Sequence, residues 1–183
     1  MRLFYGIQLP ETIRERLFDL ILDFKSYIPS GVKWVEKENL HITFQFVGDV
    51  KPTQLDDLEE SFLSSISSCE SQSFRVEGLE FFPAKQARLI WLSLNSQNKQ
   101  FSKAVKRLQN LLKQQGFKLD SKEFIPHITL GRIKSNLMKA QIEFILQNKI
   151  ELQDIDVNEI TLFASNLTKK GPNYRILQTY NLL

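Results

Sequence analysis

The sequence contains only two histidines, His41 and His127, and they lie nearly half the chain length apart. Each is followed by Ile-Thr and a hydrophobic residue, giving His41-Ile42-Thr43-Phe44 and His127-Ile128-Thr129-Leu130. A scarce side chain that recurs with the same neighbours indicates an internal repeat. Free imidazole has a pKa of about 6.5, so two imidazoles can divide the acid and base roles of a proton-transfer reaction.

Both motifs lie in segments typical of extended strands, whose successive side chains point to opposite faces. Around the first motif, alternation predicts one apolar face (Leu40, Ile42, Phe44, Phe46) and one polar face (His41, Thr43, Gln45). Around the second motif, it places His127 and Thr129 together. If two lobes carrying these strands face each other, both histidines and both threonines converge in one cleft. One imidazole would take a proton from water and the other would protonate the leaving oxygen of a phosphoester, beside hydroxyls that contact phosphate oxygens.

The rest of the sequence predicts the elements that position these strands. Apolar residues at helical spacing predict helices over 11–28, from Pro52 to Ile66, between Asn98 and Gly116, and over 136–147. Extended segments are predicted at 1–9, 32–35, 40–47, 73–82, 88–94, 124–133, 157–167 and 174–183, the last two as a hairpin. This order predicts an α+β fold with mainly antiparallel sheets and helices on their outer faces.

The organisation of the chain follows from the repeat and from the absence of a low-complexity linker between its halves. We expect residues 1-183 to form a single domain of two interleaved similar lobes, each with one motif, at 41-44 and 127-130. We expect the fourteen phenylalanines to belong to the core rather than to stack on bases.

Composition excludes several classes of protein. The 42% of hydrophobic and 25% of charged residues exclude a disordered chain and a disulfide scaffold. The net charge of +3 permits a polyanionic partner without requiring one. Cys69 is the only cysteine, and neither a signal peptide nor a membrane-spanning run is evident. We therefore expect a cytoplasmic monomer with no membrane partner.

The paired motifs resemble the His-x-Thr-x signatures of the 2H phosphoesterase superfamily, and most of all its RNA 2′,3′-cyclic phosphodiesterase (2′-5′ RNA ligase-like) branch. The resemblance extends over essentially the whole chain. It includes Arg2-Leu3-Phe4-Tyr5 with Pro10, Val32-Lys33-Trp34-Val35 before Glu38-Asn39-Leu40-His41, Phe124-Ile125-Pro126-His127, and Gly171 with Tyr174. It implies a bilobal, pseudo-twofold LigT-like fold, with two mainly antiparallel sheets facing a central cleft and helices outside.

The resemblance also implies an activity: metal-independent hydrolysis of the terminal 2′,3′-cyclic phosphodiesters of RNA to 2′-phosphomonoesters. In this pattern His41 is the proton donor to the leaving 3′-oxygen and His127 is the proton acceptor that activates water. Thr43 and Thr129 would bind substrate, and the Tyr5 ring would stack on the terminal base. The implied partners are RNA ends, tRNA-derived ones among them, or small cyclic-phosphate nucleotides.

The same pattern places an arginine shortly after the second motif, and here that residue is Arg132. A guanidinium matches phosphate oxygens in a bidentate way. Strict alternation would send Arg132 to the face opposite His127, but glycine in a strand often marks a bulge that re-aims the next side chain. We therefore predict an irregularity near Gly131 that turns Arg132 toward the histidines.

Two other functions stay open on the sequence alone. One is hydrolysis of another small phosphodiester, such as a 2′-5′ linkage or a cyclic nucleotide, and the other is an RNA-binding or 2′-5′ RNA-joining module. No His-x-His or His-x-x-x-His spacing, Walker loop or dinucleotide-binding glycine pattern is present. We therefore expect neither a metal site nor a cofactor.

Overall fold

The computed structural model describes residues 1–96, 98–119, 122–168 and 171–183. Its helices are α1 (Glu11–Tyr27), α2 (Leu55–Ile66), α3 (Gln100–Gln114) and α4 (Lys139–Gln147), with two short 3-10 helices, η1 (Lys37–Asn39) and η2 (Pro52–Gln54). Its strands are β1 (Arg2–Gln8), β2 (Val32–Trp34), β3 (His41–Asp49), β4 (Gln72–Phe82), β5 (Leu89–Asn95), β6 (His127–Ile133), β7 (Ile155–Val157), β8 (Glu159–Leu167) and β9 (Pro172–Asn181). Every predicted helix and strand is present, and β7 is the strand that the sequence patterns missed.

The two motif strands lie at the centre of the sheet. The strand order is β7-β4-β5-β6-β3-β1-β8-β9, with β2 beside β6, and the strand pairs are antiparallel. β3 and β6 meet through a single residue pair, Ile42 with Ile128. The two expected sheets are thus joined at this pair into one curved sheet. Four strands lie on each side of the junction, β6-β5-β4-β7 on one side and β3-β1-β8-β9 on the other. This is the pseudo-twofold α+β arrangement.

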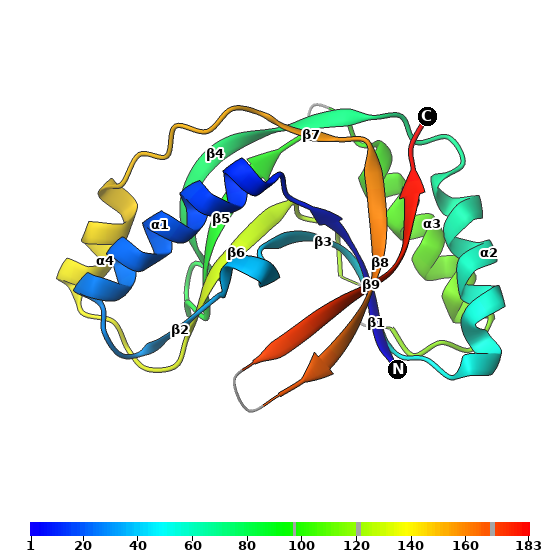
Figure 1. The fold of residues 1–183 in the computed structure, drawn as a ribbon, viewed down its shortest axis with the longest axis horizontal. Coiled ribbons are helices and arrows are strands. Elements are labelled where there is room, and N and C mark those ends of the chain that lie inside the picture. The colour runs from blue at the N-terminus through cyan, green and yellow to red at the C-terminus, as the bar shows by residue number, and fades with distance from the viewer. Residues whose placement is uncertain (97, 120–121, 169–170) are drawn as a thin grey trace.

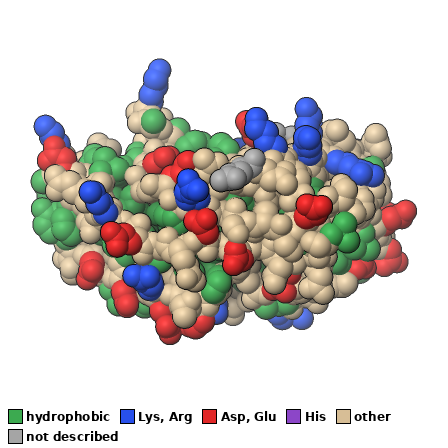
Figure 2. All heavy atoms as spheres, turned by 90° about the horizontal axis from the view of Figure 1, so that it is seen from above, with side chains coloured by type: hydrophobic (Ala, Val, Ile, Leu, Met, Phe, Trp, Pro, Cys, Tyr) green, Lys and Arg blue, Asp and Glu red, His purple; other side chains and the backbone are tan. Residues whose placement is uncertain are grey.

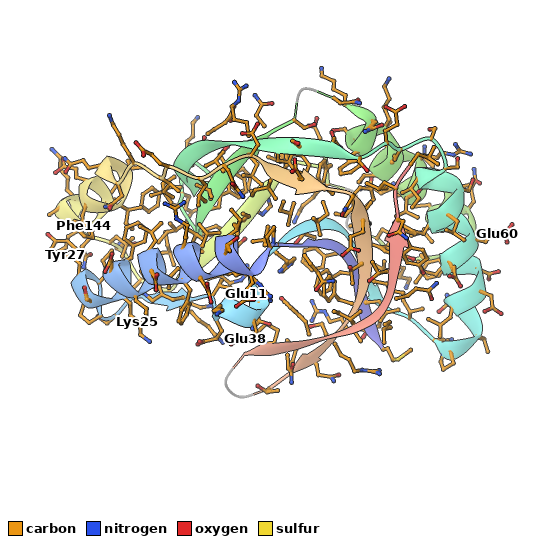
Figure 3. The ribbon with its side chains drawn as sticks, turned by 45° about the horizontal axis from the view of Figure 1, so that its top comes forward. Glu11, Lys25, Tyr27, Glu38, Glu60 and Phe144 are labelled. Atoms are coloured by element: carbon orange, nitrogen blue, oxygen red, sulfur yellow. The ribbon has the colours of Figure 1, made fainter. Side chains whose placement is uncertain are left out.

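The helices cover the sheet in two pairs, α1 with α4 at one end and α2 with α3 at the other (Figure 1). At the first end, α1 buries residues spaced three or four apart: Ile13, Leu17, Ile21 and Phe24. Phe24 contacts Trp34 of β2 and Phe144 of α4. Figure 3 shows Tyr27 and Phe144 side by side where α1 meets α4, with ring centroids 4.2 Å apart.

At the other end, aromatic rings from the helices pack on the motif strand β3 and its neighbour β1. Phe62 of α2 stacks on Tyr5 with ring centroids 3.8 Å apart, and it meets Phe44 edge-on. Phe101 of α3 also contacts Phe44 edge-on. These contacts anchor the back of the first motif, so its polar side chains are held on the opposite face.

Both motif strands contain a bulge at the fourth residue of the motif. In β6, Thr129 pairs with Trp91 and Gly131 with Ile90, which leaves Leu130 as the extra residue. This confirms the irregularity predicted near Gly131. In β3, Thr43 pairs with Gly6 and Gln45 with Tyr5, so Phe44 is the matching extra residue. A bulge of this kind inverts the alternation of the side chains that follow it.

The bulge in β3 corrects the alternation expected there. Gln45, predicted beside His41 on the polar face, is buried at 5% exposure, and Phe46, predicted on the apolar face, is 50% exposed. The physical reason is the extra residue Phe44, which exchanges the faces of the positions beyond it.

Seen from above, over β4 and β7, the surface carries basic and acidic side chains interspersed, and neither histidine appears on it (Figure 2). Within the described ranges, no helix has both the length and the apolar character needed to cross a membrane.

Candidate active site

Five of the six predicted site residues line one cavity of ≈ 1340 Å³: His41, Thr43, His127, Thr129 and Arg132. They come from the two central strands β3 and β6, which meet at the pair Ile42 and Ile128. Because those two isoleucines point into the core, the motif residues on either side of them face the cavity.

The two imidazoles are held by the same kind of hydrogen bond. His41 Nδ1 lies 2.7 Å from the carbonyl oxygen of Asn39, and His127 Nδ1 lies 2.7 Å from the carbonyl oxygen of Ile125. A carbonyl only accepts, so each Nδ1 carries the proton and donates it. In the neutral ring, Nε2 is then an acceptor, and in the charged ring it is a donor. Each histidine can therefore take or give a proton through Nε2.

Burial in the cavity wall lowers the pKa of both histidines. The pKa of His41 falls to about 4, chiefly because burial disfavours the charged ring, and the positive charges of His127 and Arg132 act in the same direction. The pKa of His127 is also lowered, by burial and by Arg132. In both cases the carbonyl that accepts the Nδ1 proton opposes the shift. In the free protein these shifts favour the neutral form of both rings.

The threonines are placed differently. Thr43 Oγ1 lies 3.0 Å from His41 Nε2, and since the neutral Nε2 accepts, the hydroxyl donates. Thr129 faces the same cavity beside His127.

Arg132 reaches the cavity because of the bulge at Leu130. It pairs with Leu89 on one side and with Lys33 of β2 on the other. Gly131 makes the packing behind it possible: a Cβ at this position would lie 2.7 Å from Val32 Cγ1 and 2.9 Å from Trp34 Cε3. The glycine predicted to re-aim Arg132 thus also lets β2 lie close against β6.

Tyr5 does not join the other predicted residues. Its side chain is fully buried, its ring stacks on Phe62 of α2, and it does not line the cavity. A base cannot reach this ring, which removes Tyr5 from the candidate base-stacking residues. The physical reason is the alternation in β1: Tyr5 points toward the helices, while its neighbour Phe4 points to the other face and contacts the His41 ring at 5.0 Å.

Aromatic side chains that the sequence analysis did not select form much of the cavity wall. Trp91 packs on the His127 ring with centroids 4.2 Å apart, and Phe82 stacks on Trp91 at 4.1 Å. On the His41 side, Tyr174 meets the imidazole edge-on at 5.2 Å, and Phe46 lines the cavity. The expectation that all phenylalanines are core is wrong for Phe46 and Phe82, which are 50% and 38% exposed. A signal was present for Tyr174, which is part of the resemblance.

The β8–β9 hairpin contributes one side of the cavity. Hydrogen bonds of Asn39 connect this hairpin to the first motif. Asn39 Nδ2 donates to the carbonyl oxygen of Pro172 at 3.0 Å, while the Asn39 carbonyl accepts from His41. One residue thus connects the position of the hairpin with the orientation of the His41 ring.

No cluster of three or more His, Cys, Asp or Glu side chains that could hold a metal ion is found within the described ranges.

The fold and the cavity define a 2H phosphoesterase, an enzyme with one histidine-threonine motif on each central strand of a pseudo-twofold sheet. The chain belongs to the LigT-like phosphoesterase family, whose model matches residues 7–91 and again residues 92–174. Among curated relatives, it is 31% identical to an RNA 2′,3′-cyclic phosphodiesterase of Methanocaldococcus jannaschii, over 98% of this chain and 100% of that protein. It is also 31% identical to one of Thermotoga maritima, over 97% of this chain and 93% of that protein.

Solved structures share the fold. A crystal structure of the Thermus thermophilus protein TT0787 covers 100% of this chain and 98% of its own, with a TM-score of 0.81 and 24% identity. The phosphate complex of Escherichia coli LigT covers 99% of this chain and 96% of its own, with a TM-score of 0.70 and 21% identity. These matches confirm the LigT-like fold expected from the motifs.

Proposed function

We propose that this protein hydrolyses the terminal 2′,3′-cyclic phosphodiesters of RNA to 2′-phosphomonoesters by two-histidine acid–base catalysis, without a metal ion. The observation that carries the proposal is the pair of imidazoles in one cavity, each with Nδ1 bound to a main-chain carbonyl, so that proton transfer falls to Nε2 in both rings. The names of the full-length relatives, RNA 2′,3′-cyclic phosphodiesterases, support the choice of substrate.

The proposed reaction is a single in-line displacement at phosphorus. Nε2 of neutral His127 takes a proton from water, and the water oxygen forms a bond to phosphorus as the bond between phosphorus and the 3′-oxygen breaks. Nε2 of protonated His41 gives its proton to the departing 3′-oxygen. The ring of His127 ends with the proton and that of His41 without it, so exchange with solvent restores both.

The remaining residues stabilise the charge that develops on the phosphate. The Arg132 guanidinium comes from the same strand as His127 and lines the same cavity, and it would contact two non-bridging oxygens. The hydroxyls of Thr43 and Thr129 would donate to the same group. For Thr43 this requires turning its hydroxyl away from Nε2 once that nitrogen carries a proton.

His41 is the proposed proton donor, but its pKa in the free protein is about 4, so near pH 7 the ring lacks the proton that it must donate. The negative charge of the substrate can restore that proton. A phosphodiester anion between the rings favours their charged forms and therefore raises both pKa values. Binding of the substrate thus supplies the protonated donor, and the free protein keeps both rings neutral.

The test uses 2′,3′-cyclic CMP and a short oligonucleotide ending in a 2′,3′-cyclic phosphate, each with and without EDTA. We expect both to give the 2′-phosphate product at rates unaffected by EDTA. Loss of turnover in EDTA would overturn the metal-independent mechanism. Turnover of neither substrate would overturn the proposed activity and favour an RNA-binding role, which would instead show strongly salt-dependent binding that is indifferent to changes of either histidine.

A further inference from the structure

Three cations occupy one face of the strands at the end of the cavity. Lys33 of β2 pairs directly with Arg132 of β6, and Lys134 lies two residues beyond Arg132. Their neighbours on the opposite face, Val32, Trp34 and Ile133, pack against the core. All three cationic residues line the cavity.

Among the residues that the structure describes, no carboxylate forms an ion pair with Lys33 or Lys134. Glu36, Glu38 and Glu123 also line the cavity, but none of them forms an ion pair within 4.0 Å with these lysines. Like charges directly opposite each other on neighbouring strands are unfavourable, so Lys33 beside Arg132 costs stability in the empty protein. An anion at this end of the cavity would offset that cost.

The local fold explains why the cations gather here. β6 pairs with β3 only at Ile128, and beyond that point β2 takes the place of β3 beside β6. The Lys33 ammonium extends from β2 to the β8–β9 hairpin, where its Nζ lies 3.7 Å from the position that a Cβ on Gly171 would occupy. It therefore lines the cavity beside Arg132, while Lys134 lies farther along the chain from Ile128, the β6 residue that meets β3.

We propose that Lys33 and Lys134 form a second phosphate subsite, which binds the phosphodiester on the 5′-oxygen of the terminal nucleotide. The inference rests on the proposed function, in which Arg132 contacts the cyclic phosphate. If Arg132 contacts the single reacting phosphate, no ion pair among the described residues accounts for the two lysines, and the next anion along an RNA strand is this 5′-phosphodiester. The subsite makes the polymer end, rather than a free cyclic nucleotide, the preferred substrate class.

The test compares kcat/KM for 2′,3′-cyclic CMP with that for the same nucleotide bearing a 5′-phosphate, and with that for a dinucleotide ending in a cyclic phosphate. We expect the wild-type protein to prefer both substrates that carry the additional phosphate, by about tenfold. In the Lys33→Ala/Lys134→Ala double variant, this ratio falls toward one and depends less steeply on salt concentration. Lys113→Ala, an exposed lysine of α3 outside the cavity, keeps the wild-type ratio.

Comparing the two phosphorylated substrates shows whether the additional phosphate or the additional nucleoside causes the preference. A preference shared by both identifies the phosphate group itself as the ligand and supports the subsite. A preference for the dinucleotide alone assigns the gain to the additional nucleoside and overturns the proposal, as does a ratio that the double variant leaves unchanged.

A binding measurement separates this proposal from the proposed function. Calorimetry compares the affinity for 2′-CMP with that for 2′-CMP bearing a 5′-phosphate, in the wild type and in the double variant. If the bisphosphate binds about tenfold more tightly, and only in the wild type, the subsite stands even if the protein turns over no cyclic phosphate. Equal affinities in the wild type would overturn the subsite and leave the hydrolase proposal intact.

Discussion

The strands that carry His41 and His127 have nearly the same backbone but different surroundings. Both hold Nδ1 on the carbonyl two residues earlier, and both have a bulge at the fourth motif residue. Beyond the bulge they differ: the position that is Arg132 in β6 is Phe46 in β3. The repeat thus supplies two equivalent imidazoles, and in the proposed mechanism the residues around them make one imidazole the acid and the other the base.

The two rings also differ in what surrounds them. Arg132 follows the second motif on the same strand, while Phe4 and Tyr174 pack on the His41 ring and Phe46 lines the cavity beside the first motif. His41 accordingly has the pKa of about 4, with burial as its main cause. We therefore expect a pseudo-symmetric sheet with these unequal surroundings to bind an unsymmetrical substrate in a single orientation.

The largest effect is expected from removing either imidazole. His41→Ala and His127→Ala should each lower kcat by ~10²–10⁴-fold, because each deletes one proton-transfer step. Steady-state kinetics with cyclic CMP measures this, with thermal unfolding to show that the fold persists. Near wild-type turnover in either variant would show that the two histidines do not act as a pair.

The second-largest effect is expected from Arg132→Ala, which removes the positive charge that follows the second motif but not the first. We expect kcat/KM to fall by about 10²–10³-fold, because a charge-stabilising donor on the phosphate is lost. Since the guanidinium lowers the pKa of both histidines, its removal should also raise both titration midpoints. Arg132→Lys should recover part of the rate, as it keeps the charge without the bidentate geometry. Unchanged midpoints would contradict the placement of Arg132 near the rings.

The Gly131→Ala substitution tests the close packing of β2 against β6 beside Arg132. The added methyl group would contact Val32 and Trp34, so we expect a loss of about 1–3 kcal/mol in the free energy of unfolding, measured with urea. Turnover should fall as well, because β2 and Arg132 move together. Wild-type stability and turnover in Gly131→Ala would show that the close approach of β2 is dispensable.

The smallest effect is a difference in titration between the two rings. With only two histidines in the chain, proton NMR resolves each imidazole, and single-histidine variants assign the signals. We expect both midpoints below 6.5, with His41 at about 4. The pKa of each ring is lower in the folded than in the unfolded chain, so their contribution to stability is complete above pH 6.5 and is lost as the pH falls toward 4.

Kinetics offers a second view of the same titrations. The alkaline limb of the kcat/KM profile reports the free protein and should lie below pH 6.5, while the limb of kcat should lie higher because the substrate anion raises the pKa values. Coinciding limbs at or above 6.5 would contradict neutral rings in the free protein.

The sequence patterns predicted nearly all of the helices and strands. The helical spacing in α1 and the glycines and prolines at element ends depend on residues close together in the chain, which is why they are readable without the fold. The short strand β7 was missed because its three residues pair with β4, which is distant in sequence.

For the site, the sequence predicted which residues take part, but it predicted only partly which way their side chains point. His41, His127 and their threonines were selected correctly as cavity residues, and the glycine before Arg132 predicted the bulge that turns it inward. Tyr5 was placed incorrectly because both faces of β1 are apolar, so its pattern does not distinguish the face that meets the helices.

The sequence by itself determined which side chains have the chemistry for proton transfer and phosphate binding, and that each lies on a strand in a repeated motif. Only the tertiary structure decided that Phe46 faces the cavity and Gln45 does not, that Trp91 and Phe82 form its wall, and that Lys33 stands opposite Arg132. The physical reason is that periodicity is a local property of the chain. The position of a bulge and the partner of a strand depend instead on pairing and packing between distant segments.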